Sequence, residues 1–290
     1  MSSAVCGLPN ISAGGPISCT RPSHPDCRAA AKSQNATLGV VLEPINNLTL
    51  ELDGWSIAYK DHIGALAAET VFDDPTTFAK YYHRNAEGLL STDGSSCPGT
   101  DCGYVDLSTY NQGRVITNGL DVVSSYRAAL GAAGHLNLGL QSTWVHKYAY
   151  QDIPGSAYHQ NVGVFTNGQP VFRWQHNAEA SWNLASYTLG VAGHFKSGYL
   201  DQSPQDPIYA ADGKTVVGQH TNRVSDYATF DVYGSYAAAS QGLSFTLGIR
   251  NLADRQPPFS NQVTVFQANY DPRFADPTGR TYYARGTYSF

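Results

Sequence analysis

From about residue 34 to its end, the chain alternates between apolar and polar residues, the period-two pattern of β-strands. The clearest stretch runs from Phe172 to Leu184, where the even positions are mainly apolar, with aromatics near both ends, and the odd positions are polar. The same pattern predicts nine strands, over residues 34–44, 47–60, 104–128, 135–149, 172–185, 187–200, 226–238, 243–252 and 280–290.

The connections between these strands alternate in length without exception. Short turns fall at 45–46, 129–134, 186 and 239–242. The other connections are long and rich in Pro, Gly, Asp and Asn, at 61–103, 150–171, 201–225 and 253–279. This order predicts a meander of hairpins with short turns at one end and long loops at the other.

Strand length separates the two architectures that fit such a meander. Strands of a soluble β-sandwich usually have about five or six residues, whereas these have about 10 to 15. A transmembrane β-barrel combines long tilted strands, short periplasmic turns, long outer loops and aromatic girdles. We therefore expect an all-β fold, an antiparallel transmembrane β-barrel segment, with the soluble sandwich as the weaker alternative.

Charged residues indicate which face of the strands meets lipid. A Lys or Arg on the lipid face at mid-bilayer costs about 2 to 4 kcal/mol, so the face with Arg173 and Glu179 is expected to line a wet interior. The segment 47–60 breaks the pattern, because Leu48, Leu50 and Leu52 share one face and Trp55, Ile57 and Tyr59 the other. A β-bulge near Asp53, or an upper half above the membrane, would explain this change. The polar face recurs at Arg127, Lys147, Lys196, Asp231, Arg250 and Arg285.

Composition and charge exclude several other classes. Only 14% of the residues are charged and the formal net charge is -5, with Lys and Arg scattered, so a nucleic-acid-binding surface is not expected. No stretch approaches the roughly 18 to 20 apolar residues of a spanning helix. The start, Met1 to Cys6, lacks the pattern of a signal peptide.

The last strand carries the sharpest local signal. A carboxy-terminal aromatic residue that closes an alternating strand resembles the assembly signal of bacterial outer-membrane barrels. We therefore expect the barrel-assembly machinery and outer-membrane lipid as partners. The residues of this signal are Tyr282, Ala284, Gly286, Tyr288 and Phe290.

Three segments resemble the TonB-dependent outer-membrane receptors. They are Leu38–Trp55 with Lys60–Ile63, Asn111–Asp121, and Gly248–Pro258 followed by Tyr270–Arg280 and the final Phe. The resemblance covers about residues 34–290 and implies a 22-stranded barrel in the outer membrane of a Gram-negative bacterium. It further implies TonB-dependent uptake of a scarce nutrient, a siderophore, vitamin or oligosaccharide, with contact to the TonB complex through a plug domain that this sequence does not contain.

The odd number of strands limits what this sequence forms alone. Single-chain bacterial barrels have even strand numbers, and open edges would leave backbone groups unpaired in lipid. We expect residues 34–290 to be the carboxy-terminal portion of the barrel and residues 1–33 a partial extracellular loop. Two alternatives remain open: an independent pore or adhesin that closes its barrel by oligomerisation, and a non-functional receptor fragment.

Chemistry-bearing motifs are sparse. His146 with Asp152, or His159 with Asp201, would meet only through the fold, and there is no GxSxG motif, so neither catalysis, a cofactor nor a metal site is expected. Cys97 and Cys102 flank a turn-forming Pro-Gly-Thr-Asp and form a candidate disulfide in an oxidising compartment, with reduced thiols as the alternative.

Ligand-binding residues cannot be assigned from the sequence. Aromatic residues of the long loops are suited either to stack on a polar ligand or to pack against one another. They are Tyr81, Tyr82, Tyr104, Tyr158, Phe165, Tyr209, Phe259, Phe266 and Tyr270.

Overall fold

The structure of the chain is a computed structural model. It describes residues 4–6, 27–66, 68–86, 88–90, 103–107, 109–166, 169–201, 207–211, 215–219, 221–238, 242–261 and 269–289. The chain divides into two compact units, residues 1–34, 57–116 and 150–159, and residues 35–56, 117–149 and 160–290.

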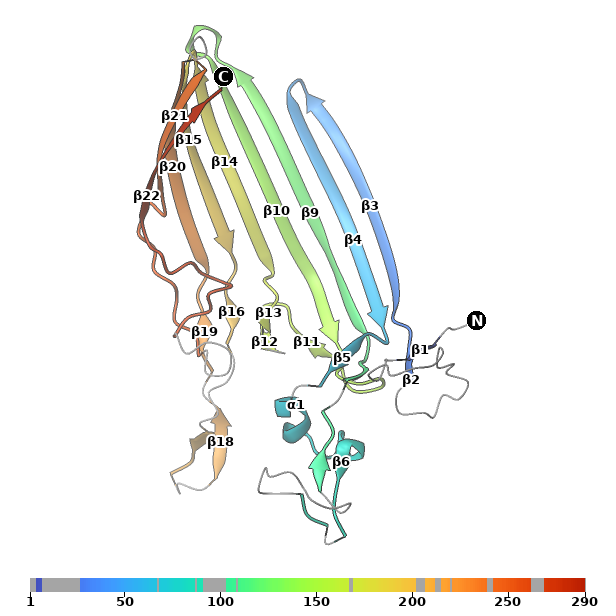
Figure 1. Ribbon diagram of the computed structural model, residues 1–290. Helices are drawn as coiled ribbons and strands as arrows, with labels where there is room; N and C mark the ends of the chain where they lie inside the picture. The colour runs from blue at the N-terminus through green and yellow to red at the C-terminus, as the bar shows by residue number, and fades with distance from the viewer. Residues whose placement is uncertain are drawn as a thin grey trace. The chain divides into compact units, whose positions relative to one another are not determined.

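One large antiparallel sheet dominates the chain, and Figure 1 shows its long strands side by side. Its hydrogen-bonded order is β22-β21-β20-β15-β14-β10-β9-β4-β3, with β11 (His159–Gln160) paired to β10. The strands of this order are β3 (Lys32–Ile45), β4 (Leu48–Lys60), β9 (Val115–Ala129), β10 (His135–Tyr150), β14 (Trp174–Leu184), β15 (Tyr187–Lys196), β20 (Tyr227–Ala238), β21 (Leu243–Arg250) and β22 (Thr281–Tyr288).

The nine predicted strands are therefore confirmed, with one large boundary error. The third strand was expected from residue 104 but begins at Val115. Residues 104–105 (β7, Tyr104–Val105) and 109–111 (β8, Thr109–Asn111) instead pair with short strands of the preceding loop, β6 (Tyr82–His83) and β5 (Ile63–Ala65). These residues form strands, as their alternation predicts, but they pair within the loop and not with the large sheet.

The short turns adopt conformations that reverse the chain within a few residues. Asn47 (φ 64°) follows β3, and Ala185 (φ 50°) follows β14. Gly134, at φ 85°, lies between β9 and β10, where an added Cβ would come within 2.0 Å of the Asn183 carbonyl oxygen. A larger residue there would be strained in its backbone and would collide with the neighbouring strand.

The first unit contains small elements of the long loop 61–114. These include α1 (Ala68–Asp73) and the 3-10 turn Ala79–Tyr81, and the hairpin partner strands β5, β6, β7 and β8. Strands β1 (Ala4–Cys6) and β2 (Cys27–Ala29) pair with each other. A cluster of buried side chains holds this loop together: Leu66, Val71, Phe78, Tyr81 and Ile153.

The second unit contains the central part of the large sheet and three long loops with their own strand pairs. These pairs are β12 (Phe165–Thr166) with β13 (Gln169–Pro170), β16 (Tyr199–Leu200) with β19 (Arg223–Val224), and β17 (Pro207–Tyr209) with β18 (Val216–Gln219). Among the described residues, no helix has the length and apolar character needed to cross a membrane.

Candidate functional site

The strand register gathers the apolar residues onto one face of the sheet. Leu140 lies opposite Ala178, Leu247 opposite Ala284, and neighbouring strands continue this pairing across β10, β14, β15, β20, β21 and β22. A one-residue shift would have moved each strand's apolar set to the other side. One such row, from β14 to β22, is Trp182, Leu189, Gly234, Leu247 and Ala284.

This apolar face is exposed rather than covered. Phe230, Leu247 and Tyr282 are each more than half exposed. Trp144 stacks on Trp174 with ring centroids 5.8 Å apart, in neighbouring strands of the same face. Exposed apolar area of this extent marks contact with a partner or a membrane.

β14 has the length that a membrane strand requires. It contains 11 residues, which at about 3.3 Å each extend about 36 Å. With a strand tilt of about 40°, this length crosses about 28 Å, comparable to the apolar band of an outer-membrane barrel. The exposed face and the strand length both fit the strand of a transmembrane barrel.

The structure shows which side of the sheet Trp55 faces in the segment 47–60. β4 runs unbroken from Leu48 to Lys60. The ring of Trp55 lies over Gly119, where a Cβ would come within 2.5 Å of it. Gly119 is two residues from Asp121, whose carboxylate accepts a hydrogen bond from Thr143 on the polar face. Trp55 thus points to the polar side, where Gly119 leaves room for its ring. A β-bulge near Asp53 and an upper half above the membrane both stay predictions.

The opposite face holds a polar network centred on His194. Its Nδ1 lies 2.8 Å from Oδ1 of Asn177, and its Nε2 lies 3.6 Å from Oδ2 of Asp231. The backbone N–H of Asn251 donates to the other oxygen of Asp231 at 2.8 Å. These groups come from four neighbouring segments, so they form a continuous hydrogen-bonding surface.

Two recesses flank His194 on this polar face. One, of about 280 Å³, lies toward the loops and includes Gln175, Lys196 and Asp276. The other, of about 270 Å³, includes Ser125, Gln141 and Glu179. Asn177 and His194 line both recesses. Such polar, open recesses are suited to hydrogen-bond a protein surface or a hydrophilic ligand.

Beside the first recess, an aromatic cluster holds the loops against the end of the sheet. Phe274, which is 1% exposed, packs edge-on against Tyr199 with ring centroids 5.3 Å apart. The ammonium group of Lys196 donates to the carbonyl oxygens of Arg273 and Phe274 at 3.0 and 3.2 Å. The buried members of this cluster are Phe165, Tyr199, Val224, Tyr227, Phe274 and Ala275.

The buried carboxylate of Asp201 links the loop 201–225 to the loop 253–279. Asp201 accepts hydrogen bonds from the Ser260 hydroxyl at 2.9 Å, the Asn261 backbone N–H at 2.5 Å and the Asn222 amide at 3.1 Å. The Tyr199 hydroxyl donates to Ser260 at 3.3 Å. Burial raises the pKa of Tyr199 to about 12, so it remains a neutral donor at physiological pH.

This linkage could not be read from the sequence. Asp201 and Ser260 lie in different long loops, and no spacing motif connects them. The sequence named Asp201 as a partner for His159 and as part of an acidic loop without calcium-loop spacing. In the structure His159 pairs instead with Asp152, at 2.9 Å between Nε2 and Oδ2. The sequence named His146 with Asp152 and His159 with Asp201 as pairs that would meet only through the fold, and the fold brings His159 to Asp152.

The remaining predicted residues have mixed outcomes. Tyr282, Ala284, Gly286 and Tyr288 share the apolar face of β22, through register with Ile249, Leu247, Phe245 and Leu243. Phe290, Cys97 and Cys102 lie outside the described residues, so the aromatic end and the candidate disulfide stay predictions. Within the described part of the chain, no group of three or more His, Cys, Asp or Glu residues is placed to hold a metal ion.

One protein-family model matches most of the chain. The model described as TonB dependent receptor-like, beta-barrel, matches residues 29–252. The chain belongs to the TonB-dependent receptor family. A comparison with curated protein sequences gives no match.

Solved structures of TonB-dependent receptors share the fold. A mutant of the ferric enterobactin receptor PfeA from Pseudomonas aeruginosa has a TM-score of 0.54 and 17% identity, over 90% of this chain and 31% of that one. The siderophore receptor PirA from Acinetobacter baumannii gives 0.54 and 15%, over 90% and 32%. The FrpB iron transporter from Neisseria meningitidis gives 0.51 and 10%, over 88% and 31%. The chain therefore spans about a third of the length of each.

Proposed function

We propose that the chain is the carboxy-terminal part of the outer-membrane barrel of a TonB-dependent receptor that takes up a scarce nutrient. Family membership and the siderophore and iron transporters among the similar structures support a nutrient receptor. A siderophore is the substrate class we favour, before a vitamin or an oligosaccharide. The proposal includes no catalytic step.

The single observation that carries the proposal is the two-faced register of the large sheet. An exposed apolar face with stacked tryptophans fits lipid, and a hydrogen-bonded polar face with recesses fits a wet lumen. In the proposed receptor, the polar face around His194 surrounds a plug domain, and the plug contacts the TonB complex. The alternating strand β22 is the proposed recognition element for the barrel-assembly machinery.

The two edges of the sheet distinguish the proposed receptor from a competing proposal. β3 and β22 stand at the two ends of the strand order, and in lipid each edge needs a partner strand. We infer that further strands of the same receptor supply these partners, with residues 1–33 in an outer loop. An independent pore or adhesin would take them from other copies of the chain and would form a detergent-resistant oligomer.

Uptake by the source organism tests the proposal. The gene is disrupted, and accumulation of a radiolabelled ferric siderophore, cobalamin and a maltodextrin is compared with that of the parent strain, with and without a protonophore. We expect the disruption to abolish one protonophore-sensitive uptake, that of the ferric siderophore. Unchanged accumulation of all three, or a loss that the protonophore does not affect, would contradict TonB-dependent uptake of these nutrients.

Matched fractionation tests the location independently. We expect the chain in the outer-membrane fraction, resistant to a urea wash and dependent on detergent for extraction. Recovery of monomeric protein without detergent would instead support the soluble sandwich.

A further inference from the structure

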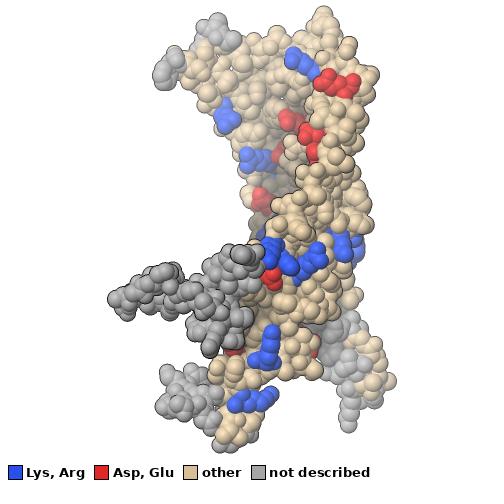
Figure 2. Space-filling view, turned by 90° about the vertical axis from the view of Figure 1, so that its right-hand side faces the viewer, with Lys and Arg blue, Asp and Glu red and all other residues tan. Residues whose placement is uncertain are grey.

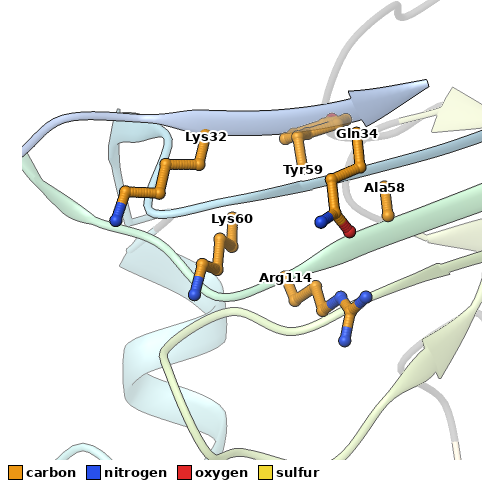
Figure 3. A pocket seen from close by; sticks show the side chains of 6 residues that line it. All are labelled: Lys32, Gln34, Ala58, Tyr59, Lys60 and Arg114. Atoms are coloured by element: carbon orange, nitrogen blue, oxygen red, sulfur yellow. The ribbon is translucent and has the colours of Figure 1, made fainter.

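A cationic cavity lies at the loop end of β3, β4 and β9. It has a volume of about 350 Å³ and is lined by Lys32, Gln34, Ala58, Tyr59, Lys60 and Arg114. Figure 3 shows the side chains of Lys32, Gln34, Lys60 and Arg114 on the same side of these strands, with Tyr59 turned to the other side. Three cations thus surround one space.

The strand register brings two of these cations together. The Gln112 N–H donates to the His62 carbonyl at 2.8 Å, and Ile63 lies opposite Asn111. In an antiparallel pair with this register, Lys60 lies opposite Arg114. Their proximity therefore follows from backbone pairing and does not depend on the rotamers of two long side chains.

Alternation along β3 and β4 assigns the cavity to the apolar face. Lys32 and Gln34 share the parity of Leu38, which is 82% exposed, and Lys60 shares the parity of Leu50 and Leu52. The polar side is the one to which Trp55 points. The cations are therefore on the side of the strands that faces lipid in the proposed barrel.

The length of the apolar run gives the height of these cations. On β4 the residues of this parity from Leu48 to Ala58 carry no charge. At about 3.3 Å per residue this stretch is about 33 Å long, and a tilt of about 40° reduces its height to about 25 Å. Lys60 is the next residue of that parity, so it lies where the hydrocarbon ends and the headgroups begin.

The three cations lack an anionic partner in the part of the chain that the structure describes. Within those ranges, the side chains of Lys32, Lys60 and Arg114 form neither an ion pair nor a hydrogen bond. Figure 2 shows Lys and Arg side chains gathered in a band across the face that it presents. Like charges around one cavity repel each other unless an anion lies between them.

We propose that this cavity binds the phosphate group of a lipid headgroup in the outer leaflet. The inference rests on the proposed function, because only an inserted barrel places this face in lipid. The Arg114 guanidinium offers paired donors that match phosphate geometry, while the two lysines add compact charge and Gln34 adds an amide donor. The cavity has room for about ten water molecules, more than a phosphate group alone needs, which suits a phosphorylated sugar headgroup.

The side on which the cavity lies separates this role from nutrient uptake. A permeating nutrient passes along the polar face, whereas the cavity is on the apolar face. The headgroup would hold the receptor at a fixed height and screen three repelling cations. It would do so most strongly at low ionic strength, because salt shortens the Debye length from about 10 Å at 0.1 M to about 3 Å at 1 M.

Binding of a phosphorylated glycolipid by the purified receptor tests the proposal. The receptor that contains this chain is held in neutral detergent, and its heat-modifiable migration first establishes that the barrel is folded. Lipid A, its dephosphorylated form and inorganic phosphate are then titrated at low and high salt. We expect lipid A to bind at least about tenfold more tightly than the other two, with the difference reduced in 1 M salt.

Charge-matched variants identify the site. Combined Lys32→Gln, Lys60→Gln and Arg114→Gln should weaken lipid A binding at least about tenfold. The control combines Arg127→Gln, Lys147→Gln and Arg285→Gln, an equal change of charge on the polar face, and should leave lipid A binding unchanged. A second variant, with all three cavity cations replaced by their Lys or Arg counterparts, should retain most of the binding.

Each outcome has a distinct meaning. Equal binding of lipid A to both triple variants, or equal binding of its dephosphorylated form, would overturn the phosphate site. Inorganic phosphate that binds as tightly as lipid A would overturn the lipid as occupant. A receptor that never becomes heat-modifiable or membrane-inserted would contradict the proposed barrel itself, which the binding titration alone does not test.

Discussion

The large sheet and the long loops differ in whether their apolar side chains are exposed or buried. On the sheet, residues such as Leu247 and Tyr282 are exposed. In the loops, Phe274 and Val71 are almost completely buried in two small clusters. The loops carry their own cores, as parts of a water-soluble protein do. Among the described residues, the apolar face of the sheet is left exposed, as on a surface that contacts a partner or a membrane.

The two regions also differ in how their polar groups are satisfied. On the polar face, His194 and Asn177 are paired but partly exposed. In the loops, Asp201 is 4% exposed and depends on donors from residues far along the chain. A buried carboxylate without its donors would be costly, whereas an exposed one would be hydrated. We therefore expect mutations in the loops and mutations on the sheet to change stability by different amounts.

The largest expected effect comes from removing the centre of the loop cluster. Phe274→Ala should destabilise the loops by about 3 to 5 kcal/mol, because it leaves a cavity among Phe165, Tyr199 and Tyr227. Protease cleavage within residues 197–226 and 251–280 should accelerate accordingly. The control Phe259→Ala changes an exposed ring and should stay within about 0.5 kcal/mol. Equal cleavage of both variants would show that the cluster does not hold the loops.

The second prediction compares adjacent residues on opposite faces. Leu140→Arg should cost about 2 to 4 kcal/mol when the receptor is refolded into vesicles and titrated with urea, because it places a charge on the lipid face. Gln141→Arg introduces the same side chain one residue later, on the polar face, and should cost less than about 1 kcal/mol. Similar costs for the two variants would mean that the exposed apolar face does not meet lipid.

The sheet could be predicted from sequence because its signal is local. Alternation such as that from Trp174 to Leu184 identifies a strand, its two faces and its length without knowledge of its neighbours. The error at residues 104–114 has the same origin, because local alternation does not say which strand pairs with which. The position of the Trp55 ring has a related cause: Gly119 on the next strand makes room for it, and the alternation within residues 47–60 does not reveal that neighbour.

The candidate site was less predictable because its contacts join distant segments. Nothing in the spacing of Asp201 and Ser260 indicates that they meet. For the loop aromatics, the sequence left stacking on a ligand and mutual packing open. Tyr81 and Phe165 are buried in the two clusters, which agrees with packing, while Tyr158 and Phe259 remain exposed.

The third prediction concerns the buried carboxylate of the loops. Asp201→Ala should cost about 1 to 3 kcal/mol, because the donors Ser260, Asn261 and Asn222 lose their acceptor. Hydrogen exchange at the backbone amide of Asn261 should accelerate. In Asp254→Ala the carboxylate lost is exposed and accepts from the Arg280 N–H, so its cost should be smaller. Unchanged exchange at Asn261 in Asp201→Ala would argue against the linkage.

The smallest expected effect is a pH dependence in the loop 150–159. Burial raises the pKa of Asp152 above its usual 3.8, an effect that the nearby His159 only partly offsets. Because the folded protein binds this proton more tightly than the unfolded chain, the contribution of Asp152 to stability is fully present below pH 3.8 and is lost as the pH rises through the higher folded pKa.

Asp152→Asn cannot titrate and should remove this dependence. Thermal unfolding of the two proteins, followed at intervals from pH 3.5 upward, should show the wild-type midpoint falling relative to that of the variant just above pH 3.8 and then running parallel to it. Asp276 should show the opposite pH dependence. Hydrogen bonds from Thr278 lower its pKa, so its contribution to stability is lost as the pH falls. A constant difference between wild type and Asp152→Asn across this range would mean that Asp152 is no more buried in solution than an ordinary surface carboxylate.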